Sequence, residues 1–232
     1  MKNQYGRNNT QSRAVAKALP KEDTSRRDLL AKIALTAGGV ALATAIPAHS
    51  QTAATPAAPT RRETEAASLK QSDIGILNFA LTLEYLEADF YSRAVEADTR
   101  NQFLRGRLRQ ATTSIRDHEL AHVAALTATI TKLGGAPVAR PQFQFPADAF
   151  ISPIKFAQHA VALESIGVGA YLGAVSLIND REIRRAAAGI YGSETRHVAI
   201  LRHLSGFNFS TRYYEGPLTA AQVTTLIAPY MA

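Results

Sequence analysis

The sequence predicts an all-α protein in which four helices form one bundle, with a single long crossover between the second and the third helix. Three observations predict this fold. The pattern E-x-x-H-V-A-x-L occurs twice, at 119–126 and at 194–201. A second pattern, L-E-x-[LI]-x4-Y, also occurs twice, at 83–91 and at 163–171. Between the two halves lies a segment with three prolines and no helical period, 134–151.

The spacing of these repeats indicates an internal duplication. The two copies of the first pattern begin 75 residues apart, and those of the second begin 80 residues apart. A loop five residues shorter in the second half accounts for both spacings. Chance placement of Glu and His gives only about 0.3 E-x-x-H matches in such a chain. Each half is therefore expected to supply one helix with a lone glutamate and one with an E-x-x-H pair.

The first half is predicted to form two helices. Ser72 and Asp73 offer a cap for the first helix. From there to Ala97, apolar residues recur at steps of three and four, as on one face of a helix. A polar break at 98–101 leads to a second helix, 102–133, which the following two glycines end.

The connector 134–151 is long enough to return along the bundle. Its 18 residues can span up to roughly 60 Å at about 3.3 Å each, whereas a 27-residue helix is roughly 40 Å long. The connector can therefore set the third helix parallel to the second. We expect Phe143, Phe145 and Phe150 to pack it onto the helices.

The second half is predicted to form helices at 153–178 and 181–204, joined by a tight turn. These helices contain several glycines, which weaken helix propensity by up to about 1 kcal/mol each. Such glycines indicate the close approach of a neighbouring segment or room for a ligand. They are Gly167, Gly169, Gly173, Gly189 and Gly192.

The repeated motifs predict a metal site. Residues three apart on a helix share a face, so each E-x-x-H pair presents a carboxylate and an imidazole together. A single motif of this kind is a pair of solvated helix residues about as often as it is part of a metal site. Two copies in one chain favour the metal site. A lone Glu from each of two helices and Glu-x-x-His from each of two others is the ligand set of dinuclear carboxylate sites. These ligands suit two iron ions or, alternatively, two manganese ions. The six predicted ligands are Glu84, Glu119, His122, Glu164, Glu194 and His197.

Four further residues lie close to the predicted ligands. Tyr91 and Tyr171 each follow a lone glutamate by seven residues, which places them on the same helix face. We expect them to donate hydrogen bonds to metal-bound carboxylates, with backbone carbonyls as the alternative. Glu87 is either an extra ligand or a polar neighbour of the site, and we favour the neighbour. His118 lies about 100° around the helix from Glu119, which indicates a supporting or surface residue.

From 73 to 204 the chain resembles the ferritin-like superfamily, and more closely its exported branch, which includes relatives of plant desiccation-related proteins. The segment 77–91, the two E-x-x-H-V-A-x-L blocks and the dipeptide 163–164 carry the resemblance. The resemblance implies a di-iron four-helix bundle, and all six predicted ligands match the superfamily's pattern. Many members of this branch have no assigned activity, so the resemblance bears on fold and site more than on reaction.

The first 50 residues are predicted to be a twin-arginine-type export signal. The pair Arg26-Arg27 precedes a short apolar stretch, 33–47, and a small-x-small cleavage site, 48–50. The apolar stretch is shorter than the 18 or so residues of a membrane span, but an uncleaved anchor is the alternative. Residues 51–71 are predicted to be a flexible linker. We therefore expect a periplasmic or extracellular protein.

Composition excludes several other classes of function. The formal charge is +7, but residues 1–50 hold 8 Lys/Arg and 3 Asp/Glu, which leaves only +2 for the remainder. There is no basic stripe with interleaved aromatics, so nucleic acid is not an expected partner. The absence of cysteine excludes disulfides, iron–sulfur clusters and thiolate metal sites.

The predicted domain covers 72–205, and the tail 206–232 is expected to contain a short helix that caps the bundle or forms an oligomer contact. Three functions fit this organisation. The first is a di-iron oxidoreductase that oxidises Fe(II) or reduces peroxide, with dioxygen or peroxide as its partner. The second is iron storage in a homo-oligomeric shell. The third is a stress-related binding or structural protein whose site serves stability. We favour the first.

Overall fold

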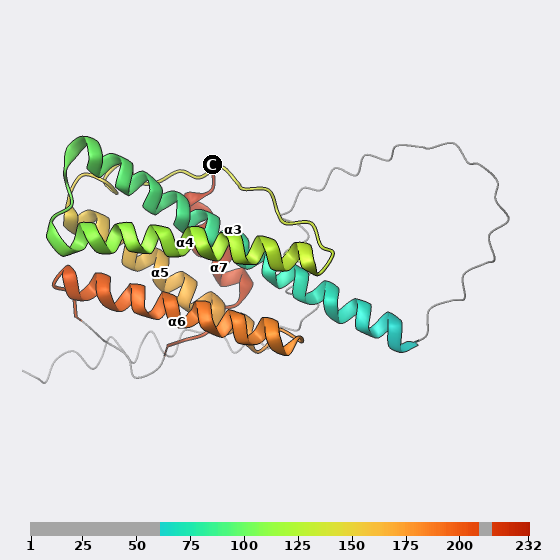
Figure 1. The fold of residues 1–232 in the computed structure, drawn as a ribbon. Coiled ribbons are helices and arrows are strands. Elements are labelled where there is room, and N and C mark those ends of the chain that lie inside the picture. Colours follow the sequence, from blue (N-terminus) through green and yellow to red (C-terminus); the bar gives the residue numbers. More distant parts are fainter. Residues whose placement is uncertain (1–60, 209–214) are drawn as a thin grey trace, which may run out of the picture.

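The computed structural model describes residues 61–208 and 215–232, which form an all-helical bundle (Figure 1). Over these residues the predicted fold class is confirmed. A single turn of 3-10 helix, Ala228–Tyr230, follows the last α-helix. The α-helices are α3 (Arg61–Asn101), α4 (Gly106–Lys132), α5 (Pro153–Val175), α6 (Arg181–Leu204) and α7 (Ala220–Ile227).

Two helical hairpins, α3–α4 and α5–α6, make up the bundle. The segment between α4 and α5 runs back along the bundle, so that α5 begins at the end where α4 begins (Figure 1). This is the crossover that the sequence predicts. Phe143 is buried in the crossover, and Phe145 and Phe150 pack against the same core. The Phe90 ring of α3 contacts the Phe145 and Phe150 rings at centroid distances of 5.3 and 5.2 Å.

The start of α3 differs from the prediction. The helix begins at Arg61, so the second part of the expected linker 51–71 is helical. Good helix formers such as Ala, Glu and Arg dominate this stretch. Asp73 lies inside the helix and does not cap it. Its carboxylate instead accepts hydrogen bonds from the backbone N–H groups of Asn179 and Asp180, both at 2.8 Å, in the α5–α6 turn. The predicted export signal lies outside the described residues.

The C-terminal tail packs along the flank of α5. The Leu218 N–H donates a hydrogen bond to the carbonyl of Gly169 at 2.8 Å. A Cβ atom at Gly173 would lie 2.1 Å from the Leu218 carbonyl oxygen. These two glycines therefore allow the close approach of a neighbouring segment, as predicted. Helix α7 then buries Val223 and Ile227 in the main apolar core.

Two apolar clusters fill the bundle interior. One includes Phe90 and Phe156, and the other includes Leu81 and Ile130, all fully buried. The predicted ligands lie along the helices between these clusters, so apolar packing encloses them from both ends of the bundle. Among the described helices, none is sufficiently long and apolar to cross a membrane.

Candidate metal centre

Each of the four long helices places one glutamate in the middle of the bundle. Glu84 comes from α3, Glu119 from α4, Glu164 from α5 and Glu194 from α6, and each has 0% of its surface exposed. A buried carboxylate is costly unless it is paired, hydrogen-bonded or bound to a metal. Four of them at one level of one bundle therefore indicate a site.

The ligand atoms fall into two groups, and within each group all of them lie within 4.8 Å of one another. All six predicted ligands belong to these groups. The carboxylates of Glu119 and Glu194 belong to both, so they can bridge two ions. Each group adds one lone glutamate and one histidine. The first group is Glu84, Glu119, His122 and Glu194, and the second is Glu119, Glu164, Glu194 and His197.

The His122 imidazole faces the first group of carboxylates. Its Nδ1 atom lies 3.0 Å from Glu119 and 3.2 Å from Glu84. A third carboxylate, that of Glu194, lies 3.3 Å from the same nitrogen. The His122 side chain is 14% exposed, so the site comes close to solvent here.

The His197 imidazole repeats this arrangement in the second group. Its Nδ1 atom lies 3.0 Å from Glu119, 3.1 Å from Glu164 and 3.7 Å from Glu194. The side chain is only 4% exposed. The internal duplication therefore appears in space as two imidazole nitrogens, each turned toward three carboxylates.

Protons compensate part of the charge in the metal-free site. Burial opposes a charge on His122 and His197, but hydrogen bonds to the surrounding carboxylates raise the pKa of each imidazole to about 12. Burial raises the pKa of Glu84 to about 8 and that of Glu164 well above its ordinary value. Burial also opposes ionisation of Glu194, but the two imidazoles lower the pKa of this carboxyl to about 2.

The two predicted tyrosines hold the lone glutamates across the duplication. The Tyr91 hydroxyl donates to Glu164 at 2.5 Å, and the Tyr171 hydroxyl donates to Glu84. Each tyrosine therefore contacts the glutamate of the other half and not the one in its own helix. Burial is the main cause that raises the pKa of both hydroxyls well above 10, so both remain donors.

A metal pair fits the donor set. Glu119 Oε1 and both Glu194 oxygens are buried and lack hydrogen-bond partners in the structure. The imidazole nitrogens next to them lie at 3.0 to 3.7 Å. Carboxylate and imidazole donors suit iron and manganese. Glu119 and Glu194 would contribute to both metal positions, and each remaining Glu–His pair would contribute to one of them.

His118 supports the second imidazole. Its Nδ1 atom lies 2.9 Å from Nε2 of His197, and the two rings stack with centroids 5.2 Å apart. His118 itself is exposed. A contact at Nε2 leaves Nδ1 of His197 facing the carboxylates. The sequence placed His118 beside the site, but its hydrogen bond depends on how α4 packs against α6.

The glycines of α5 and α6 near the metal centre differ in what lies next to them. A Cβ atom at Gly167 would lie 2.9 Å from Glu87 Oε1, so this glycine does leave room for a carboxylate. Glu87 is 3% exposed and borders the site, outside both groups of ligand atoms. In contrast, a Cβ at Gly189 would meet nothing within 4 Å, and one at Gly192 would meet only Arg196 at 3.8 Å. These two glycines therefore face open space, and no described segment approaches them closely.

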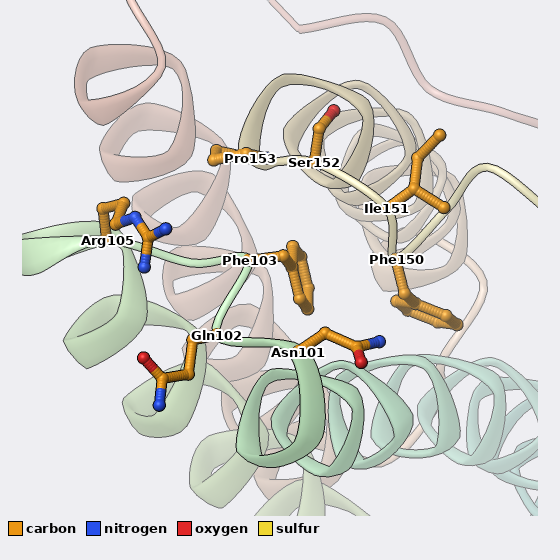
Figure 2. A pocket seen from close by; sticks show the side chains of 8 residues that line it. All are labelled: Asn101, Gln102, Phe103, Arg105, Phe150, Ile151, Ser152 and Pro153. Carbon is orange, nitrogen blue, oxygen red and sulfur yellow. The ribbon is translucent and has the colours of Figure 1, made fainter.

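The surface pocket that Figure 2 shows is separate from this centre. It lies where the α3–α4 loop meets the start of α5, and no carboxylate or imidazole lines it. The metal centre is therefore the better candidate site. The pocket is lined by Asn101, Gln102, Phe103, Arg105, Phe150, Ile151, Ser152 and Pro153.

A four-helix bundle with one crossover and a buried layer of four carboxylates and two imidazoles is typical of the class of ferritin-like carboxylate proteins. Comparison with protein families agrees with this class. Residues 72–206 match the family described as ferritin-like domain, and this match covers more than half of the chain. The chain therefore belongs to the ferritin-like domain family. No curated protein matches the chain.

Proposed function

We propose that this chain is an exported protein that binds two iron or manganese ions and, with iron, oxidises Fe(II) or reduces peroxide in stress protection. One observation carries the proposal: Glu119 and Glu194 belong to both ligand groups. Two ions that share ligands can act together on one small oxidant. With iron bound there, two Fe(II) ions would supply the two electrons that reduce one dioxygen to hydrogen peroxide, or one hydrogen peroxide to two waters, with two protons taken up in either case.

The side chains around the centre support this chemistry. Four carboxylates offset the four positive charges of two divalent ions, which makes a charged group tolerable in an apolar interior. Tyr91 and Tyr171 fix the orientation of the lone glutamates by hydrogen bonds. The apolar clusters on both sides exclude bulk water. His122 is partly exposed, and a small oxidant would approach along this side of the bundle.

The turnover assay follows Fe(II) oxidation by stopped-flow absorbance after dioxygen or peroxide is mixed with anaerobically loaded protein. We expect oxidation at least about 10-fold faster than without protein, which corresponds to a barrier lowered by at least about 1.4 kcal/mol. The variant Glu194→Ala/His197→Ala should lose this acceleration. Glu182→Ala/His203→Ala, which changes an exposed Glu and an exposed His of the same helix, should keep it. No acceleration by the wild-type chain would contradict the proposed activity.

Export is the second part of the proposal. It rests on the Arg26-Arg27 pair, the apolar stretch and the cleavage site in the first 50 residues. The twin-arginine route carries folded proteins, which would let the centre load its metal before export. Changing both arginines to lysine should retain the protein in the cytoplasm. Equal export of this variant and the wild type in cell fractionation would count against the route.

A role in stability without turnover is the alternative that one observation favours. The imidazoles of His122 and His197 each lie 3.0 Å from the carboxylate of Glu119, and ion pairs of this kind can by themselves tie the helices together. On this alternative, the protein purified from iron-replete cells carries no metal, and Glu194→Ala/His197→Ala lowers its stability. Metal analysis of the purified wild type decides between the two functions.

A further inference from the structure

Glu87 is a fifth carboxylate at the level of the metal centre, outside the six-ligand set. It lies on α3 three residues after Glu84 and therefore on the same helix face. Only 3% of its surface is exposed, and its Oε2 atom has no hydrogen-bond partner in the described part of the chain. No described cation forms an ion pair with it. A carboxylate buried in this way is costly, which indicates a partner that is not a protein group.

The duplication explains where this carboxylate lies. The second half carries Gly167 at the position that corresponds to Glu87, 80 residues further on. A Cβ atom at Gly167 would lie 2.9 Å from Glu87 Oε1 and 3.5 Å from Glu194 Oε2. Both oxygens therefore border the same small space beside α5. A glutamate at 167 would compete for this space. The glycine of the second half therefore leaves the space to Glu87 of the first half.

This space lies on the side of the centre opposite the imidazoles. Glu87 and Gly167 belong to α3 and α5, whereas His122 and His197 belong to α4 and α6. The packing of α3 with α5 and of α4 with α6 places these pairs on opposite sides of the bundle. A ligand there would add to the coordination of an ion without displacing an imidazole.

We propose that Glu87 is a seventh protein ligand, which binds one of the two metal ions in the space that Gly167 leaves. The proposal rests on the dinuclear site of the proposed function. Glu87 lies outside the two groups of ligand atoms, so it would bind after its side chain rotates toward Glu194, whose carboxylate borders the same space. The centre is therefore asymmetric, and its two ions differ in affinity.

The test measures Mn(II) and anaerobic Fe(II) affinities by competition with a chelator, for the wild type and for Glu87→Gln. The substitution keeps the shape of the side chain and removes the charged donor. One ion should bind about 10- to 100-fold more weakly, as for other groups that support a metal, while the other ion stays within about threefold of the wild type. Glu96→Gln, an exposed change on the same helix, should leave both affinities unchanged.

A second variant keeps the test valid if Glu87→Gln folds poorly. Gly167→Ala places a methyl group 2.9 Å from Glu87 Oε1 and should weaken the same ion by displacing the carboxylate. Two bound ions with wild-type affinities in both variants would overturn the Glu87 assignment alone. A wild-type chain that binds neither Mn(II) nor Fe(II) would overturn the proposed function as well, so the two failures are distinguishable.

Discussion

At the scale of single residues, protons occupy the centre in the absence of metal. Each imidazole directs Nδ1 at three carboxylates, and its pKa of about 12 keeps it protonated there. A metal ion needs the same nitrogen without its proton, so binding of metal releases protons. The contact of His118 with Nε2 of His197 then matters, because a ring held at one nitrogen presents the other nitrogen to the metal.

His118→Ala is therefore expected to weaken metal binding at the second group by about 10-fold, within the usual range for residues that orient a metal ligand. The change removes an exposed side chain, so the unfolding temperature of the metal-free protein should hardly move. Mn(II) titration followed by electron paramagnetic resonance measures the affinity. His159→Ala is the matched control, because it removes a histidine of α5 that contacts Asp148 in the crossover. Equal affinities in the wild type and His118→Ala would show that His118 does not position His197.

At the scale of elements, turns and close contacts set the register of the helices. Asp73 accepts two backbone hydrogen bonds and one side-chain hydrogen bond from the α5–α6 turn, so it ties α3 to the second hairpin. Gly169 and Gly173 let the tail lie against α5. These contacts lie outside the ligand layer, but they determine the depth at which each helix presents its glutamate.

Asp73→Ala should lower the free energy of unfolding by about 3 kcal/mol, because it removes the charged acceptor of three hydrogen bonds from the partly buried turn. Urea denaturation of the metal-free protein measures this loss. Asp117→Ala, at an exposed aspartate that pairs with the adjacent Arg116, should change stability by less than about 0.5 kcal/mol. If both variants unfold at the same urea concentration, Asp73 does not tie the two hairpins together.

Periodicity and turn residues predict most of this architecture. The sequence predicts α6 with the observed bounds and α5 with the observed start, because Pro153 and the turn before Arg181 are strong local signals. The prediction misplaced the start of α3, because the hydrogen bonds of Asp73 are made to a turn that lies far away along the chain. The six clustered ligands follow from local motifs. The contact of His118 and the pairing of each tyrosine with the opposite glutamate depend on helix packing, which no local motif encodes.

At the scale of the whole molecule, the buried acids couple stability to pH. Burial raises the pKa of Glu84 from an ordinary 4.5 to about 8, so the folded chain keeps a proton that the unfolded chain releases. The contribution of this proton to the free energy of unfolding is fully present below pH 4.5 and is lost as the pH rises to about 8. The imidazoles act in the same direction between 6.5 and about 12. Glu194, with its pKa lowered to about 2, opposes them only below 4.5.

The metal-free protein should therefore lose stability, on the order of a few kcal/mol, as the pH rises from 4.5 to 8. Urea denaturation in a pH series with a chelator present measures this trend. Glu84→Gln should flatten the curve, because it removes one of the groups that hold a proton. Added Mn(II) should reverse the trend, since ligands that lose protons bind metal more tightly. A metal-free protein that becomes more stable over this range would contradict the assignment of charges.

The most direct measurement of the central claim is the metal content of the purified chain after anaerobic loading with Fe(II) and gel filtration. The shared positions of Glu119 and Glu194 predict two ions per chain, and Glu194→Ala/His197→Ala should lose most of this metal. A wild-type chain that retains no more than one ion would contradict a dinuclear centre. A double variant that retains as much metal as the wild type would contradict the ligand assignment.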